Sequence, residues 1–593
     1  MKKYIELVYA VCLLTANLPA GFASDDDDAI HFGEISGKIT NAETGAPLAD
    51  VNISVVNSTF GAASSAHGFY LINNVPAGVY RLLISRIGYE TEFQDNVLVK
   101  PGKIAVRDVK LTPAIVQLNE VIMSASRREQ TARMTPASVS VVSSSDIEHR
   151  NVSTFDQALD DVPGISIQRT IGVSVQSLSI RGSSDVAGGG VGNRVFLAID
   201  GRPALSSDSG GALWSLVPTN FIDRIEVVKG AFSSLYGSTA MGGVINVITK
   251  KPYARGYLKV KVNSGFYESP PKSLQYNDGV SFFNSVELNH SNSFGKFSYL
   301  LSLSRKESDG HRQRSAYEFY NLYGKLFFDL SNNRNLEVTI GGDVGRNDYP
   351  HTWFSRLRPL NVAPKNTDNE QRKRTFSTDV YYYAVPNPRV KYSSRFFFYR
   401  QLFKSVFNPD DPLRSIPGNE PFGQFIRSDS RKIGNISQLD YYLSDENYLS
   451  VGADIQRDIV DSVPDTILYG NRRVNNFAAY FQDEHEISDK LTVNVGARYD
   501  LNKLEGGKLL TQFSPKVALN FSPVESWSLR FLAGRAFRAP SIAERFFQEE
   551  IAGGTRFKPN PDLRAEKVTS LELGSRFGLG SKADLDVALF HNT

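Results

Sequence analysis

Residues Arg194–Lys250 read RVFLAIDGRPALSSDSGGALWSLVPTNFIDRIEVVKGAFSSLYGSTAMGGVINVITK. Three short apolar runs, at Val195–Ile199, Ile225–Val228 and Val244–Ile248, are separated by turns that contain glycine. Short apolar runs between tight turns are typical of buried strands, whereas a helix needs a longer periodic pattern. This stretch therefore predicts a small compact sheet.

The composition limits the class of protein. The chain has 593 residues, which is too long for one ordinary globular domain, and its net charge of +3 favours neither a nucleic-acid partner nor an acidic tail. Apolar residues make up only 41% and the mean hydropathy is −0.26. Beyond the N-terminus no apolar stretch reaches the ~18 residues of a membrane helix. A β-barrel in an outer membrane fits, since its lumen-facing positions are polar and lower the mean hydropathy.

Residues after Pro252 alternate apolar and polar side chains in segments of about ten, the length that a tilted strand needs to cross a bilayer. Leu491 and Val493, for example, alternate with Thr492 and Asn494. We count about fifteen such segments, joined alternately by short turns and long loops, which is typical of outer-membrane barrels. Residues 256–593 are therefore predicted to form an antiparallel transmembrane β-barrel.

The N-terminus has the features of a signal peptide, predicted to span residues 1–23. A charged start at Lys2-Lys3 precedes an apolar stretch centred on Tyr9–Leu14, and small residues follow. A first core helix is the alternative, which this order disfavours. The only cysteine, Cys12, lies inside the segment, so the mature chain would have no thiol for a disulfide, a nucleophile or a metal.

Residues 33–112 are predicted to form a separate N-terminal β-sandwich. Apolar residues such as Ile35, Ile53 and Ile84 mark short alternating strands with turns between them. Seven or so strands in about 80 residues are typical of a small sandwich. The segments TGAPLADVNISV and GFYLINNVPAGVYRLLIS resemble the carboxypeptidase regulatory-like domain. We interpret this unit as a periplasmic domain without a catalytic constellation.

Four motifs follow one another in the opening stretch: DGRP, RIEVVKG, LYG and GGVINVIT. Upstream lie a helix start near Ser145, a helical repeat that ends at Pro163-Gly164, and the segment LSIRG. In this order they resemble the plug domain of TonB-dependent outer-membrane receptors. The resemblance implies an α+β plug domain over residues 136–250. Its motif residues are Arg181, Gly182, Asp200, Gly201, Glu226, Lys229, Gly230, Tyr236, Gly237, Gly242, Gly243 and Asn246.

Residues 113–135 are a predicted linker with an extended apolar segment. The run Glu120, Val121, Ile122, Met123, Ser124 and Ala125 lacks helix caps and is suited to pairing with the sheet edge of a partner. It resembles the TonB box that precedes the plug in this family, and an ordinary edge strand of the plug is the alternative. The resemblance implies TonB, with ExbB and ExbD, as partners that couple the inner-membrane proton gradient to transport.

Two further motifs lie near the end of the chain. GRAFRAPS and NPDLRAEK resemble the family elements "G-x-x-FRAPS" and "NP-x-L-x-PE". Glu566 and Glu572 then lie on one face of a predicted strand. The resemblance implies that they pair with basic plug residues, for which Arg181 and Lys229 are the candidates. Surface charges that happen to be six residues apart are the alternative.

The expected architecture is mainly β, with an N-terminal β-sandwich, an α+β plug domain and an antiparallel transmembrane β-barrel. A closed single-chain barrel of this class has an even number of strands, and plugged receptors have about 22. About fifteen segments are too few for such a barrel. We therefore expect the sequence to be truncated at its C-terminus.

The expected function is TonB-dependent active uptake of a scarce large ligand, with a ferric siderophore favoured by the resemblance. Cobalamin, a glycan or a peptide are alternatives within the family, and a passive porin or adhesin is the alternative outside it. His351, Trp353, Arg356 and Arg358 share a long loop, where charge and stacking suit an anionic aromatic ligand. An ordinary polar outer loop is the alternative for these four residues.

An enzyme is not expected from this sequence. Its eight histidines show no H-x-x-x-H spacing, and no G-x-S-x-G motif occurs. No cofactor, metal site or nucleic-acid partner is predicted. The expected location is the outer membrane, in contact with its lipids, with the N-terminal domain in the periplasm.

Overall fold

The computed structural model describes residues 32–593 except 57, 59, 87–88, 90–91, 113–120, 123–129, 132–134, 151, 153, 169–176, 185–190, 253–255, 332, 349–352, 364–366, 368, 388, 407–424, 445, 466–467, 525, 549, 552–554, 557 and 579–583. The predicted signal peptide, residues 1–23, lies outside the described residues. Within the described part of the chain, no helix has the length and apolar character needed to cross a membrane.

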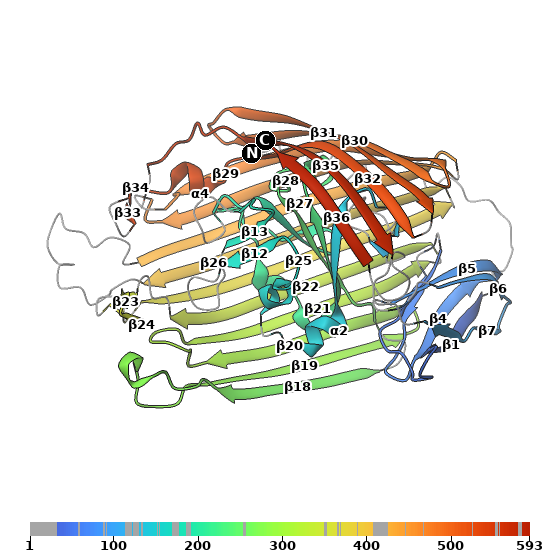
Figure 1. The fold of residues 1–593 in the computed structure, drawn as a ribbon, viewed down its shortest axis with the longest axis horizontal. Helices are drawn as coiled ribbons and strands as arrows, with labels where there is room; N and C mark the ends of the chain where they lie inside the picture. The colour runs from blue at the N-terminus through green and yellow to red at the C-terminus, as the bar shows by residue number, and fades with distance from the viewer. Residues whose placement is uncertain are drawn as a thin grey trace.

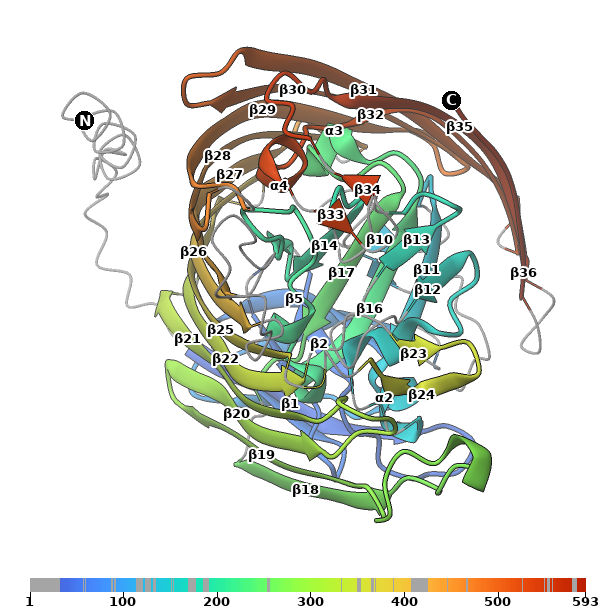
Figure 2. The same cartoon turned by 90° about the vertical axis from the view of Figure 1, so that its left-hand side faces the viewer.

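Three units follow one another along the chain (Figure 1). A small β-sandwich comes first, a plug domain second, and a large curved sheet last. Figure 2 shows the large sheet curving around the plug strands. The predicted fold class, mainly β with these three units, is confirmed.

The N-terminal unit is a sandwich of two four-stranded sheets. One sheet joins β1 to β4, β7 and β8, and the other has the order β3-β2-β5-β6. Alternate residues of β1 point inward, and Ile35, Ile39, Ile53 and Ile84 are fully buried in a core formed by this unit alone. The strands are β1 (Phe32–Asn41), β2 (Asn52–Val55), β3 (Gly61–Ala63), β4 (Phe69–Pro76), β5 (Gly78–Ser85), β6 (Glu92–Val99), β7 (Ile104–Val106) and β8 (Val109–Leu111).

The plug is built on a five-stranded sheet with the order β11-β16-β17-β14-β15. The three apolar runs of the opening stretch form β14, β16 and β17, which lie side by side in this sheet, β14 and β17 in parallel. The elements are β11 (Ser138–Ser143), α2 (Ser144–His149), η1 (Phe155–Leu159), β12 (Ile165–Gln168), β13 (Ser177–Ile180), β14 (Val195–Ile199), β15 (Arg202–Pro203), η2 (Trp214–Leu216), η3 (Thr219–Phe221), β16 (Ile222–Lys229), α3 (Ser233–Tyr236) and β17 (Gly243–Thr249).

Local sequence explains the two short helices at the start of the plug. Ser143 caps α2 in a capping box, because its hydroxyl accepts the Asp146 N–H while the Asp146 carboxylate accepts the Ser143 N–H. The predicted helical repeat after Phe155 forms only a short 3₁₀ helix, which ends before Pro163. Both helices bury apolar side chains, including Phe155, against the plug core.

Within the described residues, fifteen strands form one antiparallel sheet in which neighbours in sequence pair with each other. This agrees with the predicted count. The strands are β18 (Tyr257–Phe266), β19 (Phe282–Phe294), β20 (Phe297–Ser308), β21 (Tyr317–Ser331), β22 (Arg334–Asp348), β25 (Glu370–Asn387), β26 (Val390–Val406), β27 (Phe425–Tyr442), β28 (Asn447–Val463), β29 (Asn471–Ser488), β30 (Leu491–Leu504), β31 (Leu509–Val524), β32 (Trp527–Arg538), β35 (Glu566–Gly578) and β36 (Asp584–Asn592).

The two faces of the large sheet differ in polarity. On β30, Thr492, Asn494 and Arg498 point to the plug side and are buried, whereas Val495 and Tyr499 point outward and are exposed. Polar residues thus face the lumen and apolar residues face outward, as a membrane barrel requires. The remaining elements are β9 (Val121–Ile122), β10 (Gln130–Thr131), η4 (Lys272–Leu274), β23 (Trp353–Ser355), β24 (Arg358–Val362), α4 (Ile542–Phe546), β33 (Glu550–Ile551) and β34 (Thr555–Arg556).

The sandwich lies at the end of the barrel opposite the hairpins β23–β24 and β33–β34, which belong to long connections (Figure 1). An ion pair joins the sandwich to the plug, because Lys250 Nζ lies 3.0 Å from Asp50 Oδ2. Burial lowers the pKa of Lys250, but the carboxylates of Asp50 and Glu148 outweigh this effect and hold the pKa above its ordinary value. Lys250 follows β17, so the contact fixes the sandwich near the last strand of the plug.

The separate sandwich core yields a prediction about stability. Ile84 and Val79 share β5, but Ile84 is 0% exposed and Val79 is 63% exposed. Ile84→Ala should lower the free energy of unfolding of this domain by about 2–5 kcal/mol, because it leaves a cavity. Urea denaturation of residues 32–112, followed by circular dichroism, measures this loss. Val79→Ala should change it by less than about 0.5 kcal/mol, and equal losses would contradict the assigned core.

Candidate functional site

The junction between plug and barrel begins at the Asp200-Gly201 turn. Both residues have positive φ, 50° and 78°, which is the geometry of a tight hairpin turn between β14 and β15. The Asp200 carboxylate accepts hydrogen bonds from the Thr249 N–H and hydroxyl, both at 2.8 Å. It also lies 3.1 Å from Nζ of Lys325 on barrel strand β21. The turn is therefore held by the plug and by the barrel wall together.

Other plug motif residues shape the sheet itself. The Asn246 side chain accepts the Gly201 N–H at 3.0 Å, and buried Glu226 accepts from Arg224 Nε at 2.8 Å. Tyr236 packs on Phe196 with ring centroids 5.2 Å apart. These contacts lie within the plug, so this part of the motif set stabilises the plug sheet itself.

Glycine is required where the plug packs against Arg498 of the barrel wall. Gly237 has a φ of 74°, and a Cβ there would lie 2.8 Å from Nη2 of Arg498. That guanidinium cannot easily move, since it pairs with Asp454 at 2.6 Å and with Asp500 at 2.9 Å. Gly242 is crowded within the plug itself, because its Cβ would lie 2.5 Å from Cβ of Ser183. The remaining motif glycines, Gly182, Gly230 and Gly243, also have positive φ.

The structure brings Arg181 and Glu572 together. Arg181 Nη1 lies 2.6 Å from Glu572 Oε2, and both side chains are almost completely buried. Arg530 contacts the other oxygen of Glu572 at 3.1 Å and Asp586 at 2.6 Å. The plug arginine thus joins a charge network on β32, β35 and β36 of the barrel.

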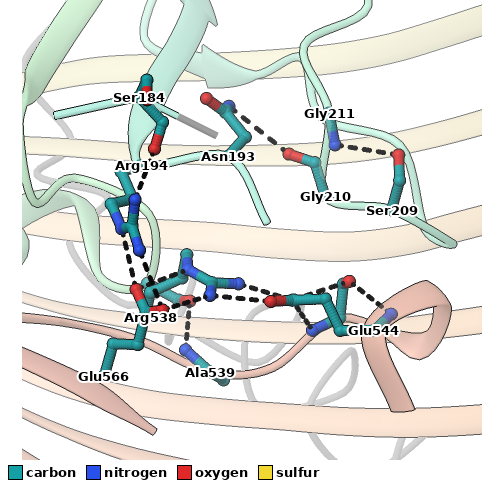
Figure 3. A network of polar contacts seen from close by, with 12 residues as sticks. Ser184, Asn193, Arg194, Ser209, Gly210, Gly211, Arg538, Ala539, Glu544 and Glu566 are labelled. Carbon is teal, nitrogen blue, oxygen red and sulfur yellow. Dashed lines mark hydrogen bonds and ion pairs between the residues drawn. The ribbon is translucent and has the colours of Figure 1, made fainter. Parts of the chain in front are cut away.

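Glu566 has different partners from those predicted. Its carboxylate accepts two hydrogen bonds from Arg194, at 2.8 and 3.0 Å, and also pairs with Arg538 at 2.9 Å (Figure 3). Arg538 in turn binds both oxygens of Glu544 in α4, at 2.5 and 2.8 Å. The plug is therefore linked through Glu566 and Arg538 to a helix in a long connection of the barrel.

Lys229 was the expected second plug cation, but Arg194 occupies that role at Glu566. Lys229 Nζ instead donates a hydrogen bond to Ser140 Oγ at 2.8 Å, within the plug sheet. The pairing of β11 with β16 places Ser138 opposite Lys229, which brings Ser140 within reach. Burial lowers the pKa of Lys229 to about 8, and the nearby Arg181 contributes to the shift.

A second buried junction was not predicted from the sequence. Arg202 of the plug lies 2.8 Å from Asp379 on β25, and Arg395 on β26 lies 2.6 Å from the same carboxylate. The Tyr399 hydroxyl donates to the carbonyl oxygen of Pro203. Arg202 stands directly after the Asp-Gly turn, which is a usable signal, but no pattern in the sequence marks Asp379.

A cavity of about 400 Å³ lies between the plug and the barrel wall. Its barrel residues come from the strand ends next to the long connections, so it lies toward that rim. Phe155 and Trp214 stack at 5.6 Å, and Lys373 donates to Ser215 at 3.1 Å across the cavity wall. Aromatic, hydroxyl and charged side chains line it, among them Phe155, Asp156, Asp208, Trp214, Ser215, Asn220, Lys306, Tyr317, Phe319, Asn347, Gln371, Lys373, Gln401, Phe403 and Tyr469.

Comparison with known families assigns each unit of this architecture. Residues 255–593 match the TonB dependent receptor-like β-barrel, residues 131–244 match the TonB-dependent receptor plug domain, and residues 35–123 match the CarboxypepD_reg-like domain. The chain belongs to the TonB-dependent receptor family. The predicted resemblance is confirmed, and the protein is an outer-membrane transporter of a family that is not enzymatic. Membership of the family also implies interaction with TonB.

Relatives of this TonB-dependent receptor are distant. An iron-regulated outer membrane virulence protein of Vibrio cholerae is 24% identical over 80% of this chain and 68% of that protein. A vitamin B12 transporter, BtuB of Vibrio cholerae, is 37% identical over 43% of this chain and 45% of that protein. The ferric enterobactin receptor PfeA of Pseudomonas aeruginosa shares the fold, with a TM-score of 0.62 and 17% identity over 80% of this chain and 73% of that chain.

The loop residues predicted to hold the receptor's ligand are described only in part. Trp353 and Arg358 belong to the hairpin β23–β24, Arg356 is exposed in its turn, and His351 lies outside the described residues. The Arg358 guanidinium lies 5.6 Å from the centroid of the Phe354 ring. Of the described side chains among them, neither Arg356 nor Arg358 is among the residues that line the cavity.

The predicted coupling segment of the receptor is described only in part. Val121 and Ile122 form β9, which pairs antiparallel with Gln130 and Thr131 of β10. Glu120, Met123, Ser124 and Ala125 lie outside the described residues. Among the residues that the structure describes, no group of three or more His, Cys, Asp or Glu side chains is placed to hold a metal ion.

The buried pair at Glu572 yields a prediction about how firmly the plug is held. Glu572→Gln removes the negative charge between Arg181 and Arg530, and breaking such a buried pair costs about 3–5 kcal/mol. We expect the plug to be released at a lower urea concentration in receptor embedded in liposomes. With Trp353 and Trp527 replaced by phenylalanine, fluorescence of Trp214 reports plug release.

Glu318→Gln is the matched control for this measurement. Glu318 pairs with Arg305 at 2.8 Å on the exposed outer face of the barrel and does not contact the plug. It should leave the urea midpoint unchanged, because exposed ion pairs contribute little. The same midpoint for Glu572→Gln as for the unsubstituted receptor would show that the pair does not hold the plug.

Proposed function

We propose that this receptor takes up a ferric siderophore across the outer membrane by TonB-dependent active transport. The observation that carries the proposal is the cavity shared by plug and barrel, because a ligand bound there contacts the element that has to move. Its stacked Phe155 and Trp214 and its lysines Lys306 and Lys373 suit a ligand that is both aromatic and anionic. The likeness to an iron-regulated outer membrane protein supports iron as the cargo.

Transport requires the plug to be loosened from inside the barrel. The ion pairs of Arg181, Arg194 and Arg202 with barrel carboxylates are buried or partly buried, so they resist spontaneous release. TonB, energised by ExbB and ExbD, would supply the work by binding the coupling segment at residues 120–125. Strand pairing is a suitable mode of binding, since Val121 and Ile122 already adopt extended backbone in β9.

Cobalamin is the second candidate ligand. The observation in its favour is the 37% identity with a vitamin B12 transporter, which is higher than that with the iron-regulated protein but covers only 43% of this chain. The two candidates differ in charge and size, so direct uptake measurements separate them. Cells that carry the receptor as their sole transporter of this class should accumulate ⁵⁵Fe from one class of ferric siderophore. Accumulation of ⁵⁷Co-cyanocobalamin alone would establish the second candidate instead.

The domain boundaries belong to this proposal. A periplasmic sandwich over residues 33–112 precedes a linker at 113–135, a plug at 136–250 and the barrel from residue 256. The contact between Lys250 and Asp50 supports a sandwich placed beneath the plug, on the side from which TonB approaches. His351, Trp353, Arg356 and Arg358 would then make the first contact with ligand at the opposite rim.

The cavity assignment predicts an effect on ligand affinity. Trp214→Ala removes the ring that stacks on Phe155, and loss of an aromatic contact of about 1 kcal/mol should weaken binding of the accepted ferric siderophore at least about fivefold. Equilibrium binding to whole cells without energy measures this directly. Trp527→Ala is the control, since Trp527 stacks on Phe577 at the rim of short turns. Equal affinities for Trp214→Ala and Trp527→Ala would exclude the cavity as the binding site.

The coupling assignment predicts loss of transport with retained binding. Ile122→Pro removes a backbone N–H from the strand and should abolish uptake, because proline cannot complete a β-ladder with a partner. Uptake of the labelled ligand by energised cells is the measurement, and Ile122→Val is the control that keeps the strand. Normal uptake by the proline variant would rule out coupling through this segment.

A further inference from the structure

The outward face of the barrel sheet carries a second hollow, separate from the plug and from the cavity above. It has a volume of about 990 Å³ and crosses strands β19 to β26. Leu288, Leu303, Leu322, Val344 and Phe376 line it, and all five side chains are more than one-third exposed. These residues point away from the lumen, so in the membrane the hollow faces lipid.

Gly342 explains why the sheet is hollowed at this point. The strand register places Leu322 of β21, Gly342 of β22 and Phe376 of β25 in one row across the sheet. Large side chains stand on both sides of a residue that has none. The nearest atom to a Cβ at Gly342 would be the backbone oxygen of Thr375 at 3.2 Å, with no side chain covering the site.

Three arginines line the same hollow, and they differ in their partners. Arg305 pairs with Glu318 at 2.8 Å and Arg400 pairs with Asp429 at 2.7 Å. Arg374 is exposed, and within the described residues it has no ion-pair partner. Its cross-strand neighbours are Val344 and Leu402, both apolar.

An exposed arginine among apolar neighbours on the membrane face can bind an anion from outside the protein. Arg374 lies four residues into β25, near the rim of the long connections, where the headgroups of the outer leaflet begin. A guanidinium binds phosphate through two parallel hydrogen bonds, and clustered basic residues at a membrane surface bind anionic headgroups. The apolar floor of the hollow matches an acyl chain rather than a free ion.

We propose that this hollow is a binding site for a phosphorylated lipid of the outer leaflet. An acyl chain lies in the space beside Gly342, between Leu322 and Phe376. Arg374 binds the phosphate, and Arg305 and Arg400, already neutralised by carboxylates, border it. The receptor would therefore carry a specific lipid on its wall, independently of the ligand in its lumen.

The test measures binding of diphosphorylated lipid A to the purified receptor by native mass spectrometry. Arg374→Gln should raise the apparent Kd for lipid A about tenfold, because a charge-assisted contact is lost. Arg334→Gln, at the exposed opposite end of β22, is the matched control and should leave the Kd unchanged. Gly342→Leu should also weaken binding while keeping Arg374, since the added side chain occupies the acyl site.

Three results would overturn the proposal. The first is equal binding of lipid A by the receptor and by Arg374→Gln. The second is equal binding of lipid A before and after enzymatic removal of its phosphates. The third is displacement of the lipid by millimolar inorganic phosphate, which would identify a site for free anions. Unchanged ligand uptake by Arg374→Gln and by Gly342→Leu shows that both variants are folded, so loss of lipid binding cannot be attributed to misfolding.

Discussion

Paired charges between the plug and the barrel wall are the contacts on which the rest of this structure depends. The inner face of the barrel sheet is polar, so apolar packing alone cannot hold the plug. Arg181, Arg194 and Arg202 each reach a barrel carboxylate instead, and the pairs of Arg181 and Arg202 are almost completely buried. A buried ion pair contributes little net stability as a whole, but removing only one of its two charges is costly, because the other charge is left buried without a partner. This asymmetry suits a plug that must remain in place and yet be movable.

The carboxylates also connect parts of the molecule that lie far apart in the chain. Glu566 is shared by Arg194 of the plug and Arg538 of the barrel, and Arg538 continues to Glu544 in α4. A displacement of α4 would therefore reach Arg194 of the plug through the side chains of Arg538 and Glu566. Asp379 is shared in the same way by Arg202 and Arg395. Each shared carboxylate keeps a barrel cation beside it when the plug arginine leaves, so no bare negative charge remains in the wall.

Much of the fold could be predicted from the sequence, because alternation and turn residues act locally. The three apolar runs of the plug and the fifteen barrel strands follow directly from side-chain period and glycine turns. The partners of Glu566 could not be predicted, since they depend on how two separate units dock. Lys229 and Arg194 are both basic plug residues, and only the register of β11 against β16 directs Lys229 toward Ser140. The cavity could not be predicted for the same reason, because its walls come from segments that lie far apart in the chain. The Phe155 ring lies 5.6 Å from the ring of Trp214, and Lys373 of the barrel donates to Ser215 of the plug at 3.1 Å.

The position of β11 has a mechanical consequence. This strand is the outermost strand of the plug sheet and pairs there with β16. It is also the first strand of the plug sheet after the proposed coupling segment, so tension applied at residues 121–122 would reach that sheet through Ser138 first. If that tension runs along the strand, all of its ladder bonds share the load and the plug resists as a block. If it runs across the strand, the bonds open one after another from Ser138. The direction of the applied force, and not only its size, therefore determines whether the plug leaves whole or unravels from this edge.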